Sequence, residues 1–282
     1  MKKRNWIFIL SFLFCANAFA QTCDIKGVEK DAPALCGKNI QGGMFYGEAK
    51  GWDVYSGDEK ISLKDIFVLG LSRNQSDTVQ LKFCHGDSCQ TYSYLIKKAK
   101  YNMSYVTVPR KYREPSKQDS IRIQEEKKQI IAARASAASD TAVNFLDIRV
   151  PSSFKKFRVS TKYGSGRVYN NEKPDSIDGH GGIDYAASMG TPIPSFSRGT
   201  VVLAANHYLN GNIVIVSLGH NVFVVYLHMS KIKVKVGDKV DFGTIIGNVG
   251  STGQSDGPHL HFGMSVGSTY INPKWWFENV RN

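Results

Sequence analysis

The chain has 282 residues, of which 42% are hydrophobic and 21% charged, an ordinary globular composition that excludes a disordered chain or a fibrous repeat. At about 150 residues per domain, this length predicts two domains. The formal net charge of +12 favours an anionic polymer as partner, in a bacterium the cell wall or outer-membrane lipid rather than nucleic acid. A basic surface that serves only solubility is the alternative.

Residues 1–20 are predicted to be a secretory signal peptide. Residues 1–4 are basic, residues 6–14 are apolar apart from one serine, and residues 18–20 form a small-x-small cleavage site. A lipoprotein anchor at Cys15 is disfavoured, because the residue before such a cysteine is normally tiny and here it is phenylalanine. No later apolar run approaches the ~18 residues of a membrane span. We therefore expect an exported monomer without an integral membrane segment, in the periplasm, secreted or associated with the outer membrane.

Four cysteines follow the predicted cleavage site, at Cys23, Cys36, Cys84 and Cys89. An even number in an oxidising compartment predicts two disulfides, for which three pairings are possible. Proximity in the sequence favours Cys23–Cys36 and Cys84–Cys89. A zinc knot that uses His85 is disfavoured, because the Cys-x4-Cys spacing has no second ligand pair.

Residues 21–112 are predicted to form a small N-terminal β domain. Polar turns separate runs of alternating or β-branched residues at Phe67–Gly70, Val79–Phe83, Tyr92–Ile96 and Tyr105–Val108. Nothing in this part carries obvious chemistry.

Residues 113–150 are predicted to be a helical linker. We expect one amphipathic helix over residues 116–139, with Asp119 as its N-cap and its charged side chains on a solvated face. The apolar positions of this helix are Ile121, Ile123, Ile130 and Ile131.

Residues 151–282 are predicted to form an antiparallel β domain. Short runs rich in β-branched and aromatic residues lie at Thr200–Ala204, Asn212–Ser217, Asn221–Tyr226 and His259–Phe262. No helical pattern separates these runs, as a parallel sheet would require.

Six of the seven histidines lie in this last region, and the first belongs to the sequence His180-Gly-Gly-Ile-Asp184. Adjacent glycines disfavour a helix. On a strand, alternate side chains share a face, so His180 and Asp184 would lie side by side with Gly182 leaving space between them. Such a pair could bind a metal ion.

The sequence His259-Leu-His261-Phe places both imidazoles on one face of a strand and the apolar side chains on the other. We expect His261 to join His180 and Asp184 as a third metal ligand, with His259 beside the metal. Three nitrogen or oxygen ligands with an open fourth position are typical of catalytic zinc and fit calcium or copper less well.

Three further histidines differ in what they predict. His228, at the end of a predicted strand, is expected to reach the same groove. His207 and His220 are expected to be structural, His207 in a loop and His220 in a hairpin turn where Asn221 tolerates a left-handed conformation.

Three motifs occur in one order: His180-x-Gly-x-Asp184, Tyr226-x-His228 and Gly253-x-x-x-Gly257-Pro-His259-x-His261-Phe262. As a set they resemble the lysostaphin/LytM-type zinc metallopeptidases, which are cell-wall endopeptidases, over about residues 157–275. Gly263 and the turn before Asn221 depart from the family pattern, but they touch no ligand and put only substrate fit in question.

The resemblance implies a mainly β fold with an antiparallel catalytic domain of the duplicated-hybrid-motif (LytM) type. It implies one Zn²⁺ per catalytic domain, held by His180, Asp184 and His261, and catalytic roles for His228 and His259. The implied reaction is hydrolysis of peptidoglycan stem peptides, in a Gram-negative cell at the D-alanyl–diaminopimelate cross-link.

Other classes of function are weighed against this one. A non-catalytic LytM-like scaffold that activates a cell-wall amidase is the main alternative, although such proteins lack one or more ligands and this chain keeps all five site residues. A lipoyl-type carrier lacks its modifiable lysine motif here, and a serine hydrolase lacks Gly-x-Ser-x-Gly. The N-terminal domain is expected either to position the cell wall or to cover the groove.

Overall fold

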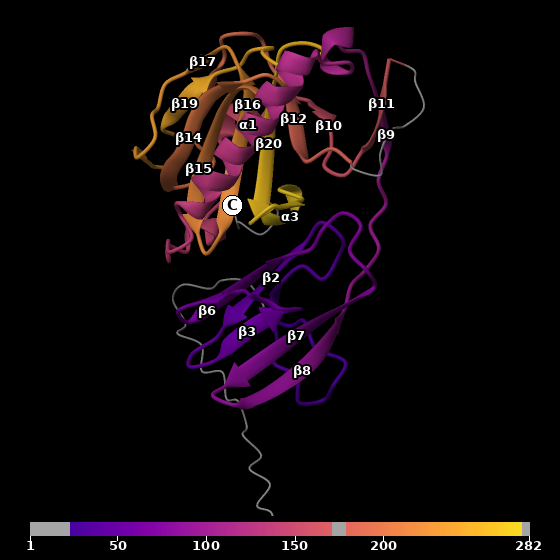
Figure 1. Ribbon diagram of the computed structural model, residues 1–282, viewed down its shortest axis with the longest axis vertical. Coiled ribbons are helices and arrows are strands. Elements are labelled where there is room, and N and C mark those ends of the chain that lie inside the picture. The colour runs from indigo at the N-terminus through magenta and orange to yellow at the C-terminus, as the bar shows by residue number, and fades with distance from the viewer. Residues whose placement is uncertain (1–22, 171–178, 278–282) are drawn as a thin grey trace, which may run out of the picture.

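The computed structural model describes residues 23–170 and 179–277, so the predicted signal peptide lies outside the described residues. The chain forms two β-rich regions stacked along the long axis (Figure 1). No helix within the described ranges combines the length and apolar character needed to cross a membrane. The predicted mainly antiparallel β fold is confirmed.

The N-terminal region is made of short antiparallel strands: β1 (Cys36–Gly37), β2 (Met44–Glu48), β3 (Asp53–Ser56), β4 (Glu59–Lys60), β5 (Ser62–Leu63), β6 (Ile66–Gly70), β7 (Thr78–His85) and β8 (Ser88–Leu95). They form two sheets, in the orders β1-β2-β6-β5 and β4-β3-β7-β8. Alternation along β7 buries Val79, Leu81 and Phe83 between the sheets. The strands predicted at Phe67–Gly70, Val79–Phe83 and Tyr92–Ile96 are therefore confirmed. The one predicted at Tyr105–Val108 is wrong in bounds and place, since the strand there is Met103–Val106 and pairs with Gly166–Tyr169 of the C-terminal region.

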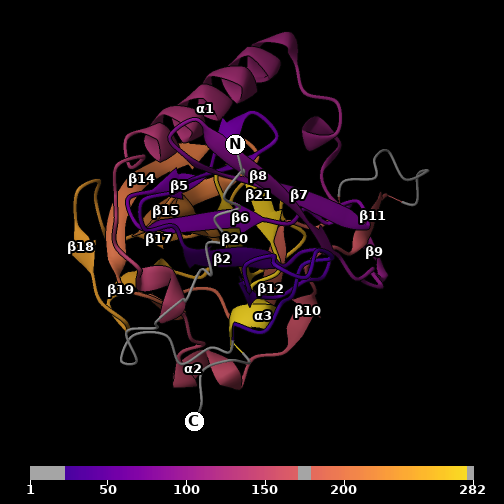
Figure 2. The same ribbon diagram turned by 90° about the horizontal axis from the view of Figure 1, so that it is seen from below.

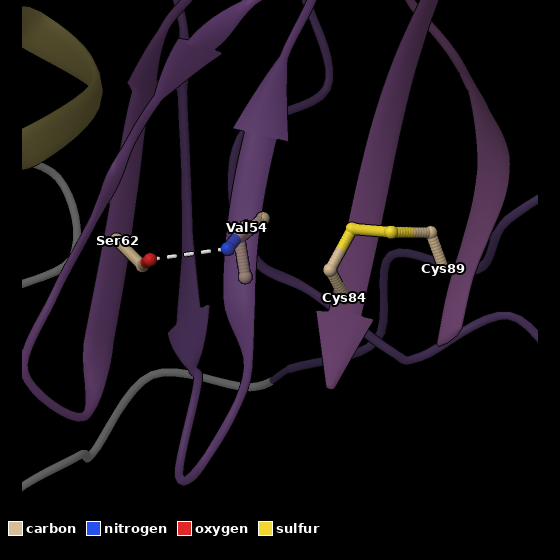
Figure 3. The surroundings of a disulfide bond; sticks show 4 residues. All are labelled: Val54, Ser62, Cys84 and Cys89. Atoms are coloured by element: carbon tan, nitrogen blue, oxygen red, sulfur yellow. Dashed lines mark hydrogen bonds between the residues drawn. A yellow bond between two sulfur atoms is a disulfide. The ribbon is translucent and has the colours of Figure 1, made fainter. Parts of the chain in front are cut away.

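Both disulfides favoured by the sequence are present. Cys84 and Cys89 lie directly opposite each other on β7 and β8 and close their hairpin (Figure 3). Cys23–Cys36 ties the first described residue to β1. Figure 3 also shows Val54 N–H donating to the Ser62 hydroxyl at 3.0 Å, a link between the two sheets.

The connecting segment contains β9 (Met103–Val106), η1 (Arg110–Tyr112), α1 (Lys117–Ala135) and η2 (Asn144–Leu146). The predicted helix is present, but Asp119 is not its N-cap. Ser116 occupies that position, and its hydroxyl accepts a hydrogen bond from Asp119 N–H at 3.0 Å. Its apolar face is also weaker than predicted, because Ile121 and Ile131 are exposed.

The C-terminal region consists of α2 (Ser152–Lys155), α3 (Lys274–Phe277) and the strands β10 (Val159–Thr161), β11 (Gly166–Tyr169), β12 (Gly182–Ala186), β13 (Pro192–Pro194), β14 (Gly199–His207), β15 (Gly211–Gly219), β16 (Val222–Met229), β17 (Lys231–Ile232), β18 (Lys239–Val240), β19 (Ile245–Asn248), β20 (His259–Val266) and β21 (Thr269–Ile271). The main sheet has the order β10-β12-β20-β16-β15-β14-β18, with β21 also pairing β20. A smaller sheet has the order β13-β19-β17. The strands predicted here are confirmed, and their pairing is antiparallel.

The two regions are in direct contact. The strand β6 lies against β20 and β21 beneath the main sheet (Figure 2). Met44 and Tyr46 from β2 belong to the same buried apolar cluster as Phe145 and Val222. One exception to the antiparallel pattern adds a further connection, since β9 pairs with β11 in parallel.

Phe196 lies at the centre of the aromatic core beneath the main sheet. Its ring stacks on Phe262 with centroids 4.4 Å apart and makes edge contacts with Phe154 and Tyr185. Its backbone N–H donates to the Tyr226 hydroxyl at 2.9 Å. This packing holds β12, β16 and β20, which also carry Asp184, His228, His259 and His261.

Phe196→Ala is expected to lower the free energy of unfolding by about 3–5 kcal/mol, because a fully buried ring is lost and the cavity cannot collapse. Denaturant unfolding measures this loss. Phe242→Ala, at a half-buried ring, is the matched control and should cost less. Equal losses for the two variants would contradict the central role of Phe196.

Candidate metal centre

Three side chains from two distant segments of the chain meet above β12 and β20. His180 precedes β12, while Asp184 on β12 lies directly opposite His261 on β20. Asp184 Oδ1 is 2.9 Å from His180 Nε2 and 2.8 Å from His261 Nδ1. These two nitrogens are 2.8 Å apart. The three predicted ligands are therefore buried together and offer their atoms to one point.

The chemistry of these donors fits a divalent cation. His180 Nδ1 lies 3.1 Å from the Lys162 carbonyl, which can only accept, so Nδ1 carries the hydrogen and Nε2 presents a lone pair. That lone pair faces an oxygen of Asp184 and a nitrogen of His261. Acceptor atoms this close repel one another unless a proton or a cation lies between them. Two imidazoles and one carboxylate with room for a fourth ligand suit zinc.

The electrostatics of the triad favour metal binding near neutral pH. Burial lowers the pKa of His261 to about 4, so this imidazole is neutral. Burial alone would raise the pKa of Asp184, but the adjacent imidazoles of His180 and His261 hold it well below its usual value. Asp184 is therefore ionised, as a metal ligand must be.

Gly182 makes the close approach of β12 to β20 possible. A Cβ at this position would lie 2.3 Å from the Phe262 carbonyl oxygen and 2.8 Å from His261 Nε2. No side chain fits there without moving the strand that carries His261. The space predicted between His180 and Asp184 is thus filled by the neighbouring strand and its imidazole.

His228 and His259 lie beside this triad, with their ring centroids 4.9 Å apart. His259 Nε2 is 3.9 Å from Asp184 Oδ1. The Nδ1 of His228 donates to the Thr252 carbonyl and that of His259 to the Gly257 carbonyl, each at 2.8 Å. Both rings therefore leave Nε2 free to accept a proton. Burial, with repulsion from His259, lowers the pKa of His228 to about 3.

The backbone at His228 departs from strand geometry. Its φ is 62°, in the left-handed region that few non-glycine residues adopt, although histidine does so more often than most. Its N–H donates to the Asn210 carbonyl at 3.1 Å rather than to a main-sheet neighbour. Strained conformations of this kind cluster at functional sites, and here the strain aims the ring at His259.

The remaining histidines lie away from this centre. His207 Nε2 contacts the Gln129 side chain of α1 at 3.0 Å. His220 contacts the Thr141 carbonyl at 3.1 Å and shares a left-handed turn with Asn221. Both have the structural environments expected from the sequence, although His207 ends β14 rather than lying in a loop.

Two cavities border the triad. One, of about 570 Å³, is lined by His180, His228 and His261. The other, of about 320 Å³, is lined by Asp184 and His259. The ligand side chains therefore contribute to the walls of both cavities.

Arg167 is a site residue that the motifs did not predict. Its Nη2 lies 3.4 Å from Asp184 Oδ2. It sits on β11, in a stretch without a recognisable pattern. The hydrogen bonds of Gly164 and Ser165 to His180, just before this strand, and the pairing of β11 with β9 hold β11 beside the site. No signal in the sequence alone could have identified it.

The N-terminal region supports His180 through a chain of hydrogen bonds. Arg73 Nε donates to the Gly164 carbonyl at 2.5 Å. Gly164 N–H donates to the His180 carbonyl, and His180 N–H donates to the Ser165 carbonyl, each at 2.8 Å. The guanidinium of Arg73 also stacks over Tyr101 at 4.8 Å. The loop that orients His180 is thus held from the neighbouring region.

Arg73→Ala is expected to weaken zinc binding severalfold, somewhat less than the roughly 10–100-fold cost of removing a direct partner of a ligand. The reason is that the loop around Gly164 loses its external support. Competition with a chromogenic chelator measures the zinc affinity, with exposed Lys98→Ala as control. A gain in hydrolysis with unchanged affinity would instead favour a covering role for the N-terminal region.

The comparisons with known proteins concern mainly the C-terminal region. Residues 178–273 match the model of Peptidase family M23. Peptidoglycan DD-endopeptidase ShyA of Vibrio cholerae is 38% identical over 117 residues, which are 42% of this chain and 27% of that protein. Lysostaphin of Staphylococcus simulans is 40% identical over 123 residues, which are 39% of this chain and 25% of that protein. The chain thus spans about a quarter of each relative, and the resemblance predicted from the motifs is confirmed.

A crystal structure extends the likeness of fold to the N-terminal region. A putative peptidase M23 from Pseudomonas aeruginosa matches with a TM-score of 0.59 at 21% identity, over 86% of this chain and 96% of that chain. At this identity the match shows the fold alone. It confirms the fold type predicted for the C-terminal region.

Proposed function

Because the chain carries a peptidase family M23 domain, we propose that it is an exported, zinc-dependent endopeptidase that hydrolyses peptide cross-links of peptidoglycan. The observation that carries the proposal is the meeting of His180, Asp184 and His261 beside two imidazoles with free Nε2 atoms. The name of ShyA as a peptidoglycan DD-endopeptidase supports the substrate class. Peptidoglycan stem peptides are the proposed partner and a monomer in the periplasm the proposed state.

His180, Asp184 and His261 would hold one zinc ion. When bound, zinc supplies a Lewis acid that polarises a carbonyl and makes water nucleophilic near neutral pH. His228 and His259 supply the proton transfers. One Nε2 accepts the proton of the attacking water, and the other imidazole, once it is protonated at Nε2, donates to the developing oxyanion. A proton is then delivered to the leaving amine nitrogen as the amide bond breaks.

The hydrogen bonds of His228 and His259 suit them to this work. Each ring is fixed by a backbone carbonyl through Nδ1, so neither must reorient to present Nε2. Both are buried, which keeps water from competing for the same atoms. The low pKa of His228 keeps this ring in its neutral, proton-accepting form.

The amidase-activating scaffold remains the alternative function. The complete set of five site residues favours catalysis over that role. Zinc content and digestion of sacculi separate the two, since a scaffold would require neither.

The test is mass spectrometry of muropeptides after purified sacculi are incubated with the protein. Wild type should convert cross-linked dimers to monomers, whereas His259→Ala should not. Exposed His85→Ala, at the tip of the N-terminal hairpin, is the matched control and should act as wild type. Dimers that persist with wild type would refute the endopeptidase function.

A further inference from the structure

The two cavities beside the triad differ in charge. The described residues that line the larger cavity include Arg73 and Arg167, and none of them is acidic. The smaller cavity is lined by Arg158 but also by Asp184 and Asp256. A substrate bound at the triad therefore has a basic cavity and a mixed cavity beside it.

Arg167 is placed to bind an anion in the larger cavity. Its guanidinium is partly exposed, with a side-chain exposure of 21%. It makes two long contacts, Nη2 to Asp184 at 3.4 Å and Nη1 to the Tyr169 hydroxyl at 3.3 Å, and its buried Nε has no hydrogen-bond partner. A guanidinium has five N–H donors in a planar fork, so most of the hydrogen-bond donors of Arg167 remain available to a ligand.

A role in orienting Asp184 does not by itself explain why residue 167 is an arginine. A neutral donor would orient that carboxylate as well, whereas a guanidinium repels the cation that the carboxylate is placed to bind. With zinc bound, two positive groups would share one carboxylate. An incoming anion relieves this conflict, because it faces the metal and the guanidinium together.

We infer that the larger cavity is a carboxylate subsite, in which Arg167 recognises a free carboxylate next to the scissile amide. The inference rests on the proposed function and specifies its substrate. In a D-alanyl–diaminopimelate cross-link, the carbon bonded to the scissile nitrogen carries such a carboxylate, whereas a glycine bridge has none there. Arginine binds carboxylates through two parallel hydrogen bonds, which gives direction as well as affinity. The amine side of the scissile bond therefore lies in the larger cavity.

The test compares two short peptides that differ only at this carbon, one with the carboxylate and one with a carboxamide. Calorimetry with the zinc-loaded full chain should show that wild type binds the carboxylate peptide at least tenfold more tightly. Arg167→Gln should bind both equally while its zinc affinity stays the same or increases. Arg167→Lys, which keeps the charge without the fork, should discriminate weakly. Arg158→Gln removes the same charge from the smaller cavity and should keep the full preference.

Equal binding of the two peptides by wild type would overturn the subsite, and so would a full preference of Arg167→Gln for the carboxylate peptide. Loss of zinc from Arg167→Gln would also overturn it, because Arg167 would then act by supporting Asp184. Hydrolysis of cross-linked muropeptides by wild type is measured in parallel. Hydrolysis without a carboxylate preference would support the proposed function and contradict the subsite. A preference for the carboxylate peptide without hydrolysis would support the subsite and contradict the proposed function.

Discussion

Asp184→Ala is expected to abolish zinc binding and to reduce hydrolysis of cross-linked muropeptides more than any other single change. Asp184 Oδ1 is the atom that lies within 2.9 Å of both His180 and His261. It is also the only negative charge in the triad. The loss should exceed the roughly 10²–10³-fold effect of removing a single oxyanion donor, since the polarised carbonyl and the activated water are lost together.

Two measurements check the Asp184 prediction. Metal analysis after dialysis should find zinc in wild type and none in the variant. Added zinc should raise the melting temperature of wild type, because a ligand that binds only the folded state stabilises it, and should leave the variant unchanged. Asp256→Ala removes an exposed carboxylate from the neighbouring cavity and is the matched control. A variant that retains zinc and activity would show that the metal lies elsewhere.

Much of this centre follows from strand periodicity. Because alternate side chains share a face, the spacing of His259 and His261 predicted that both point the same way, and the structure places both at the site. The inference about His259 and His261 succeeds because it depends on positions only two residues apart. Gly182 was predicted to leave space between His180 and Asp184, but the neighbouring strand fills it, since a Cβ there would meet Phe262 and His261.

Other features could not be predicted, because they depend on contacts between distant segments. Arg167 contacts Asp184 from β11, a strand that pairs in parallel with β9 and whose preceding residues are hydrogen-bonded to His180. Arg73 contacts Gly164 although 91 residues separate them. The N-cap of α1 was misassigned to Asp119 because serine and aspartate are both good N-caps three residues apart, and only the hydrogen bond from Asp119 N–H to Ser116 distinguishes them.

The contact between the regions also changes the expected role of the N-terminal part. Tyr46 of β2 packs edge-on against Phe145 with centroids 5.8 Å apart. Together with the Arg73–Gly164 hydrogen bond, this contact makes the N-terminal region a support for the loop of His180. The carboxylate subsite also depends on the N-terminal region, because residues 72–74 form part of its wall. The proposed subsite and the orientation of His180 thus depend on the same interface between the two regions.

His228→Gln is expected to keep zinc and to lower kcat by about 10²–10⁴-fold, the contribution typical of a positioned proton-transfer group. Glutamine can still donate to the Thr252 carbonyl, which accepts from His228 Nδ1 at 2.8 Å in wild type, but it cannot exchange a proton. KM should change little, because His228 acts on the reaction rather than on substrate affinity. Leu227→Ala, at the adjacent half-buried position, is the control for local packing.

The same substitution should alter how stability depends on pH in the metal-free protein. Burial lowers the pKa of His228 from 6.5 to about 3, so the folded state binds fewer protons than the unfolded state between these values. Its contribution to the free energy of unfolding is complete above pH 6.5 and is lost progressively as the pH falls toward 3. His228→Gln should therefore lose less stability than wild type between pH 6.5 and 4 in denaturant unfolding. Parallel losses in the two proteins would mean that this imidazole is solvated in the folded state and is not held as a neutral proton acceptor.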